Sequence, residues 1–222
     1  MTTHLESELQ LLKTDTLNMW KLVCLQLTNG KEALIDFDKD LARQIVATEK
    51  RVNAYELKID RDCENIFALF NPVAIDLRFV LAVLKINSNL ERIADIAESI
   101  ARFVIDIEKR FDPELLQHTK VIEMFDLANE MLLDAAHAFE KEDTKMARYL
   151  FKIDEKLDET NNNASYVVTD YIKSHPDNIR ESLHILSMIR KLERVGDQTK
   201  NIAEEIIFFI EAKVLKHKGE KQ

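Results

Sequence analysis

Apolar residues recur every three or four positions through most of the 222-residue chain, which is the spacing of one face of an α-helix. The first such stretch covers residues 5–28. The Asn29-Gly30 pair predicts its end, because glycine readily adopts the left-handed conformation that closes many helices. The chain is therefore expected to begin with one long amphipathic helix.

The rest of the chain repeats this pattern between recognisable boundary residues. Asp36 or Asp38 can cap a second helix, and Asp143 can cap a fifth. Asp112 followed by Pro113 is the clearest boundary, since proline suits the first turn of a helix. Five further helices are predicted, at about 38–70, 73–108, 113–140, 144–174 and 177–216.

One segment of the chain occurs twice. Residues 89–101 and 191–204 both contain Leu-Glu-Arg, an Asp four residues after the Glu, and Ile-Ala beginning five residues after that Asp. A constant offset indicates an internal repeat. An offset of 102 residues relates four identical pairs, namely Glu91 and Glu193, Asp95 and Asp197, Ile100 and Ile202, and Ala101 and Ala203.

The repeat and the helix pattern together predict an all-α fold of six helices. These helices are expected to form two tandem three-helix up-and-down bundles, residues 1–110 and residues 111–222. Short connections make neighbouring helices antiparallel. The chain contains only 3 Gly and 3 Pro, which argues against a sheet-rich fold with many tight turns.

Composition narrows the classes of partner and compartment. The net charge of −9 and the pI near 5.3 argue against a nucleic-acid partner, because such a partner requires a basic face. No apolar run is long enough to span a membrane. Cys24 and Cys63 form no CxxC motif and are expected to be buried small residues in a reducing compartment. A cytoplasmic protein without membrane insertion is predicted.

The repeated segment carries two acidic pairs, Glu91 with Asp95 and Glu193 with Asp197. The members of each pair are four residues apart on the flank of an apolar stripe, where like charges repel each other. A solvated helix face usually alternates the signs of its charges, so these pairs indicate a bound cation. The competing interpretation is a hydrated acidic face offset by Arg92, Arg194, Lys50 and Lys200.

Facing helices are expected to add further oxygen ligands to each pair. If the second and third helices fold back at Pro72, Asn53 lies opposite Glu91 and Glu49 lies opposite Asp95. All-oxygen ligation of this kind suits hard cations such as Fe(III), Mn(II), Mg(II) or Ca(II).

The second half has the corresponding turn at Pro176. Equal distances from that turn give two facing candidates for each acid, Glu159 or Asp158 for Glu193, and Glu155 or Asp154 for Asp197. The predicted metal ligands are Glu49, Asn53, Glu91 and Asp95 in the first half and Asp154, Asp158, Glu193 and Asp197 in the second.

A carboxylate-bridged metalloenzyme would need further ligands that this sequence does not supply in the usual pattern. Di-iron bundles carry the motif Glu-x-x-His on two helices. Glu181 and His184 match it once, without a second copy, and a surface position is expected for this pair. No catalytic residue is predicted.

Three stretches of the chain resemble the PhoU family of phosphate-signalling regulators, which accompany phosphate-specific ABC transporters. The resemblance implies two tandem three-helix bundles, each with a Glu/Asp-x-x-x-Asp motif that binds a multinuclear iron or zinc cluster at the surface. Glu91 with Asp95 and Glu193 with Asp197 match that motif. The stretches are Asn71-Pro-Val-Ala-Ile-Asp-Leu-Arg78, Leu84-Lys-Ile with Leu90-Glu-Arg-Ile-Ala-Asp95, and Leu192-Glu-Arg-Val-Gly-Asp197 with Asn201-Ile-Ala-Glu204.

The two copies of the motif differ from each other. In the first half, Ala94, Ser99 and Arg102 replace the Gly, the Asn and the acid that are usual in the family. Arg102 can pair with Glu98, four residues before it. The second half keeps the glycine as Gly196, so the second metal site is expected to be the more intact one.

The resemblance also implies a function. It implies a non-enzymatic, negative regulator of phosphate uptake and of phosphate-starvation signalling, which acts in the cytoplasm. The implied partners are the ATPase subunit of a phosphate ABC transporter and a sensor histidine kinase, and a homodimer is expected. Two alternatives stay open: a metal-free helical adaptor and a carboxylate-bridged metalloenzyme.

Overall fold

The computed structural model describes residues 4–215, most of which are helical, with no strand among them. The predicted all-α fold is confirmed. Within this range lie seven α-helices and one short 3-10 helix: α1 (His4–Asp36), α2 (Lys39–Phe70), α3 (Ala74–Asp106), α4 (Pro113–Thr119), α5 (Val121–Lys141), α6 (Thr144–Ser174), η1 (Pro176–Asn178) and α7 (Ile179–Glu211).

The helix starts predicted from aspartate are confirmed. The side chain of Asp38 accepts hydrogen bonds from the second and third backbone N–H groups after it, at 2.9 Å each, and so caps α2. Asp143 caps α6 in the same way, at 2.9 and 3.1 Å. Asp112 caps α4, whose first residue is Pro113. Each cap stabilises its helix by about 1 kcal/mol.

The predicted end of the first helix at Asn29-Gly30 is wrong. α1 continues to Asp36, and the left-handed residue that follows it is Phe37, with φ 57°. Gly30 is buried inside the helix, where an added Cβ would lie 3.5 Å from Cε1 of Phe125. Burial of the next helical turn, including Leu34, outweighs the local preference for a stop at glycine.

The fourth predicted helix is also wrong in one respect, because it is broken into α4 and α5. Lys120 adopts the left-handed conformation, with φ 54°, between the two helices. Leu115 and Val121 are both fully buried, although six residues correspond to about 240° around a continuous α-helix. The break turns both side chains toward the core.

The last helix is shorter at both ends than the sequence predicts. A 3-10 turn over Pro176–Asn178 precedes it, and α7 begins at Ile179. It ends at Glu211, because Ala212 takes the left-handed conformation with φ 56°. The predicted end at Lys216 lies outside the described residues.

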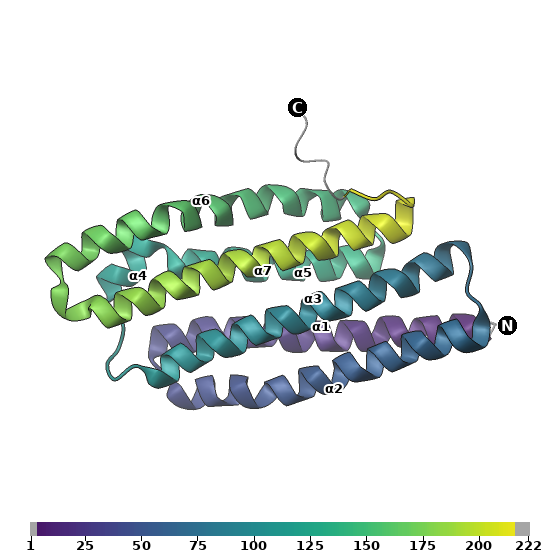
Figure 1. Ribbon diagram of the computed structural model, residues 1–222, viewed down its shortest axis with the longest axis horizontal. Helices are drawn as coiled ribbons and strands as arrows, with labels where there is room; N and C mark the ends of the chain where they lie inside the picture. The colour runs from purple at the N-terminus through teal and green to yellow at the C-terminus, as the bar shows by residue number, and fades with distance from the viewer. Residues whose placement is uncertain (1–3, 216–222) are drawn as a thin grey trace.

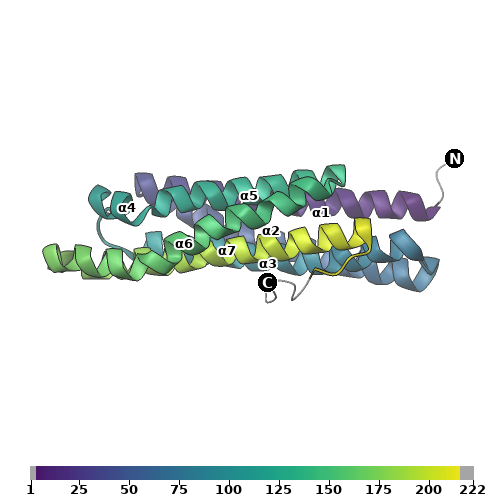
Figure 2. The same ribbon diagram turned by 90° about the horizontal axis from the view of Figure 1, so that it is seen from above.

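The helices form two layers (Figures 1 and 2). α2, α3, α7 and α6 lie side by side in one layer, and α1 and α5 pack behind it (Figures 1 and 2). α1, α2 and α3 pack on one another, as do α5, α6 and α7, so the chain consists of two tandem three-helix bundles. α3 packs against α7 at the centre of the front layer. The boundary at residue 110 stays a prediction.

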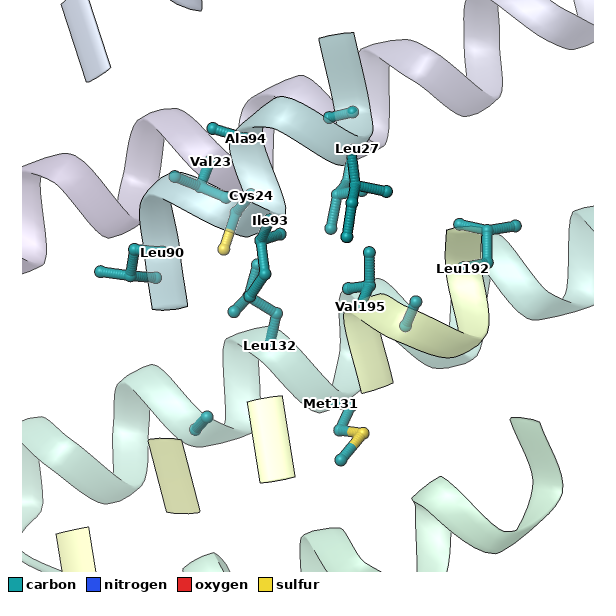
Figure 3. Close-up of a cluster of buried hydrophobic side chains, with 14 of the residues drawn as sticks. Val23, Cys24, Leu27, Leu90, Ile93, Ala94, Met131, Leu132, Leu192 and Val195 are labelled. Atoms are coloured by element: carbon teal, nitrogen blue, oxygen red, sulfur yellow. The ribbon is translucent and has the colours of Figure 1, made fainter. Parts of the chain in front are cut away.

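One hydrophobic core runs through both bundles. Figure 3 shows side chains of the first bundle, such as Leu90 and Ile93, in one cluster with Leu132 and Val195 of the second. The indole Nε1 of Trp20 in α1 donates to the backbone oxygen of Leu132 in α5 at 3.0 Å. An aromatic group from four helices adds to this core, namely Trp20, Phe79, Phe139 and Phe209.

Candidate metal centres

The first acidic cluster lies between α2 and α3. Asn87 of α3 donates to the backbone oxygen of Glu56 at 3.0 Å and to Oδ1 of Asp60 at 2.8 Å. Glu91 is one helical turn after Asn87, so it lies beside the part of α2 that is one turn before Asp60. This register places Glu91 beside Asn53 and Glu56.

Electrostatics confirm that these acids lie close together. The pKa of Glu91 is raised to about 7, first by burial and then by the negative charges of Asp95, Glu56 and Glu49. Burial also raises the pKa of Glu56, with contributions from Asp60, Asp95 and Glu49. The structure therefore brings the predicted acids Glu49, Glu91 and Asp95 together.

Asn53 and Glu49 are directly paired within the first cluster. The side-chain amide of Asn53 donates to Oε1 of Glu49, one turn earlier in α2. This bond uses one oxygen of the carboxylate and leaves the amide oxygen of Asn53 as an acceptor. Among residues 4–215, no lysine or arginine forms an ion pair with Glu49, Glu91 or Asp95.

The second cluster lies between α6 and α7 and contains a lysine. Asp154 is 3% exposed, and its Oδ2 accepts a hydrogen bond from Nζ of Lys200. The same Nζ donates to Oδ1 of Asp197 at 3.1 Å. Burial alone would lower the pKa of Lys200, but the hydrogen bonds and charges of the two aspartates outweigh burial and raise it.

The remaining acids of the second cluster lie close enough to interact electrostatically. Burial raises the pKa of Glu193, and the charges of Asp197, Asp158 and Asp154 raise it further. Of the paired alternatives that the sequence left open, Asp154 is buried and Asp158 is partly buried, whereas Glu155 and Glu159 are exposed. The structure thus selects Asp154 and Asp158 as the α6 members.

Gly196 allows α6 and α7 to approach closely beside this cluster. A Cβ added at position 196 would lie 2.6 Å from Cδ1 of Leu157 and 2.8 Å from Oδ1 of Asp154. Both distances are shorter than real Cβ contacts, so a side chain at position 196 would force Leu157 and Asp154 to shift. In the first half, Ala94 and Val52 occupy the repeat-equivalent positions of Gly196 and Leu157, and both are buried.

The chemistry of both clusters suits a hard cation. Their donors are carboxylate oxygens with one amide oxygen, which Mg²⁺, Mn²⁺ and Fe³⁺ prefer. Oδ1 of Asp154 is buried and has no hydrogen-bond partner. Within residues 4–215, however, no three His, Cys, Asp or Glu side chains already surround a common point. Binding of a metal would therefore require side chains to rotate. In the first half, the ligands would be Glu49, Asn53, Glu91 and Asp95.

Two other groups named from the sequence lie away from these clusters. The expected surface position of Glu181 is wrong, since its side chain is buried and its Oε1 lies 3.7 Å from Nζ of Lys109. The ring of His184 packs on Phe103, at 5.0 Å between centroids. Both cysteines are buried, as expected, and burial raises the pKa of each thiol to about 12.

The predicted ligand sets leave out two residues that take part in the clusters. Glu56 acts on the pKa of Glu91 more strongly than Glu49 does. Glu56 lies seven residues after Glu49, which places both on the same helix face, and this spacing could have indicated that Glu56 belongs to the cluster. Lys200 lies three residues after Asp197, a spacing that permits the observed ion pair, although the sequence indicates it only as a charge on a hydrated face.

The raised pKa of Glu91 predicts that the metal-free protein loses stability as the pH rises. The folded state holds this proton more tightly than the unfolded chain, so the contribution is fully present below the usual value of 4.5 and is lost through about pH 7. We expect the free energy of unfolding to fall by about 1–2 kcal/mol across this range, because the group is partly screened by solvent. Urea unfolding in a chelator at several pH values measures this slope.

The variant Glu91→Gln should have a shallower slope, since its side chain does not titrate. Glu155→Gln, at an exposed acid of α6, is the matched control and should keep the slope of the parent. Equal slopes in the parent and Glu91→Gln would contradict the prediction.

Comparison with known proteins gives the family. The family model described as PhoU domain matches residues 16–104 and again residues 121–206. The chain belongs to the PhoU family. One PhoU domain match falls in each three-helix bundle, and the resemblance seen in the sequence is confirmed.

Relatives and solved structures of the PhoU family match over nearly the whole chain. The phosphate-specific transport system accessory protein PhoU of Edwardsiella tarda is 32% identical over 220 residues, covering 96% of this chain and 87% of that protein. The accessory protein PhoU homolog 1 of Thermotoga maritima is 31% identical, covering 96% and 91%. The crystal structure of PhoU from Pseudomonas aeruginosa superposes with a TM-score of 0.84 at 30% identity, covering 93% of this chain and 99% of that one. The crystal structure of the phosphate transport system regulatory protein PhoU from Streptococcus pneumoniae superposes with a TM-score of 0.83 at 26% identity, covering 96% of this chain and 99% of that one.

Proposed function

We propose that this protein is a non-enzymatic accessory protein of a phosphate transport system, which regulates phosphate uptake. The observation that carries the proposal is the pair of PhoU domain matches, one in each bundle. Relatives that align over almost the whole chain are named as accessory proteins of phosphate-specific transport. The fold also agrees with that of a protein named as a phosphate transport regulator.

The proposed partners follow from this role. They are the ATPase subunit of a phosphate ABC transporter and a sensor histidine kinase, and the protein would act as a negative regulator of phosphate-starvation genes from the cytoplasmic side. A homodimer is part of the same proposal. No helix within residues 4–215 combines the length and the apolar character that a membrane span requires.

Metal binding at the two acidic clusters is the second part of the proposal. Burial, together with repulsion from neighbouring carboxylates, raises the pKa of Glu91 in the first cluster to about 7, and a cation would relieve that repulsion. Iron or zinc is the proposed metal, with Mn²⁺ and Mg²⁺ as further hard cations that the oxygen donors suit. A bound cation would tie α2 to α3 without catalysing a reaction.

Complementation tests the regulatory role. In a bacterium that lacks its own PhoU, expression of this chain should restore repression of a phosphate-starvation reporter at high phosphate. Phosphate uptake should return to the rate of the complete strain. An unchanged reporter and uptake rate, with the chain expressed and folded, would refute the role. Co-purification with the ATPase subunit and the kinase tests the partners separately.

Metal analysis tests the first cluster. We expect Glu91→Gln/Asp95→Asn to weaken metal binding there by about 100-fold, because the number of charged ligands sets affinity. Titration of chelator-stripped protein with Mn²⁺ measures the change. The control Glu155→Gln/Glu159→Gln removes the same two charges from exposed positions and should bind as the parent does. Equal binding by all three proteins would mean that the metal, if bound, lies elsewhere.

A further inference from the structure

The second cluster already contains a cation of its own. Nζ of Lys200 lies between Oδ2 of Asp154 on α6 and Oδ1 of Asp197 on α7, and it donates to both. It therefore joins the same two helices, through the same carboxylates, that a metal ion would join. The side chain of Asp154 is almost completely buried, whereas that of Lys200 is only partly so.

The first cluster has no such group. The repeat-equivalent position of Lys200 is occupied by Glu98, whose Oε1 accepts from Nη2 of Arg102 at 2.6 Å. That pair lies within α3, one turn apart, and does not connect α3 to α2. The repeat-equivalent of Asp154 is Glu49, whose Oε1 accepts a hydrogen bond from the neutral amide of Asn53. The second cluster thus holds a cationic side chain between its two helices, and the first cluster does not.

We propose that Lys200 is the resident cation of the second cluster, so that the two clusters take different cations. The ammonium of Lys200 would hold α6 to α7, and a hard divalent or trivalent metal would hold α2 to α3. This inference rests on the proposed metal binding of the first cluster. The second half, which keeps the family's glycine as Gly196, is then the half whose helices are joined by a lysine in place of a metal.

Physical chemistry gives the reason for the difference. A metal can enter the second cluster only if the hydrogen bonds from Lys200 to Asp154 and Asp197 are broken first. The displaced ammonium would also remain close to the incoming positive charge and repel it. In the first cluster, a metal meets carboxylates that form no ion pair with a lysine or arginine within residues 4–215, so no cation has to be displaced. Metal affinity should accordingly be higher in the first half.

Removal of Lys200 should expose a latent metal site. Without Lys200, the buried carboxylate of Asp154 has no charged partner, which is strongly unfavourable. One of its oxygens, Oδ1, has no hydrogen-bond partner even now. A divalent metal supplied from solution could then neutralise the cluster.

Mn²⁺ titration of chelator-stripped protein tests the proposal. The first cluster is disabled by Glu91→Gln/Asp95→Asn, and Lys200→Met is added to that background. We expect the added change to tighten Mn²⁺ binding by about 10- to 100-fold, the equivalent of one or more charge-assisted hydrogen bonds. It should also lower the Tm in chelator, and Mn²⁺ should restore it.

Three controls make the outcome decisive. Lys156→Met changes an exposed lysine of α6 that forms no ion pair within residues 4–215, and it should alter neither Mn²⁺ binding nor Tm. Lys200→Arg keeps the charge and should keep weak binding. Lys200→Gln removes the charge but keeps a hydrogen-bond donor. It should also tighten Mn²⁺ binding, and it replaces Lys200→Met in the test if that variant does not fold.

Two different failures can be told apart. Unchanged or weaker Mn²⁺ binding after Lys200→Met or Lys200→Gln would overturn the role of Lys200. Equal Mn²⁺ affinity of the two clusters in the parent would overturn it as well. If instead the parent binds no Mn²⁺, Fe²⁺ or Zn²⁺ and Glu91→Gln/Asp95→Asn changes nothing, the proposed metal function itself fails. In that case, the Tm of Lys200→Met in chelator still reports whether Lys200 acts as a structural cation.

Discussion

Replacement of Phe139 by alanine should lower the free energy of unfolding by about 3–5 kcal/mol, the usual range for loss of a buried aromatic ring. The ring is fully buried at the point where the two bundles meet. Its centroid lies 5.8 Å from that of Trp20, 6.0 Å from Phe79 and 6.1 Å from Phe209. These residues belong to α5, α1, α3 and α7, so the cavity would open in both bundles at once.

Denaturant unfolding followed by two signals measures this effect. Circular dichroism reports the helices, and the fluorescence of Trp20, the only tryptophan, reports the shared core. Both signals should give one coincident transition in the parent and in the variant, because the core is continuous. Tyr166→Ala, at a ring that is 78% exposed, is the control and should cost far less. Two separate transitions in the parent would contradict the shared core.

Gly196→Ala should destabilise the protein by about 1–3 kcal/mol, the usual cost of overpacking a buried contact. In an isolated helix this change would stabilise by about 1 kcal/mol, so the sign itself is a test. The new Cβ would lie 2.6 Å from Cδ1 of Leu157 and 2.8 Å from Oδ1 of Asp154. Both side chains are buried, so neither can move away without disturbing its neighbours.

The first bundle suggests the compensating change. There, the repeat-equivalent positions hold Ala94 and Val52, a larger residue on α3 facing a smaller one on α2. Leu157→Val should therefore recover part of the loss caused by Gly196→Ala, since it removes the closest atom. A double-mutant cycle by urea unfolding measures this coupling. Strictly additive effects of the two changes would contradict the assigned contact.

The same comparison explains how two copies of one unit have diverged. The acids Glu91 and Glu193, and Asp95 and Asp197, are retained in both copies, while the residues around them differ. Lys200 in the second copy and Glu98 in the first have opposite charges at equivalent positions. Because a single charge next to a carboxylate pair alters its affinity for a cation, the copies need not share one role.

Most of the helical pattern could be read from the sequence alone. Period-three-and-four apolar stripes and capping aspartates are local signals, and they correctly gave the long helices and the starts at Asp38, Asp112 and Asp143. The repeat at an offset of 102 residues identified the two related halves. Equal distances from the turn at Pro72 also brought the α2 and α3 acids into the correct neighbourhood, because two straight antiparallel helices have the same rise per residue.

Tertiary structure alone decided the features that depend on contacts between distant residues. Gly30 does not end α1, because burial of the next helical turn, including Leu34, makes the helix continue. Lys120 breaks the fourth helix, because Leu115 and Val121 must both reach the core.

The acidic clusters show the same limit most clearly. The sequence alone determined that Glu91, Asp95, Glu193 and Asp197 are paired acids on two helix flanks. It could not determine that Nζ of Lys200 reaches across to Asp154, because that bond depends on the close approach of α6 and α7 at Gly196. Residue spacing along one helix determines which side chains share a face, whereas the distance between two helices determines which charges meet.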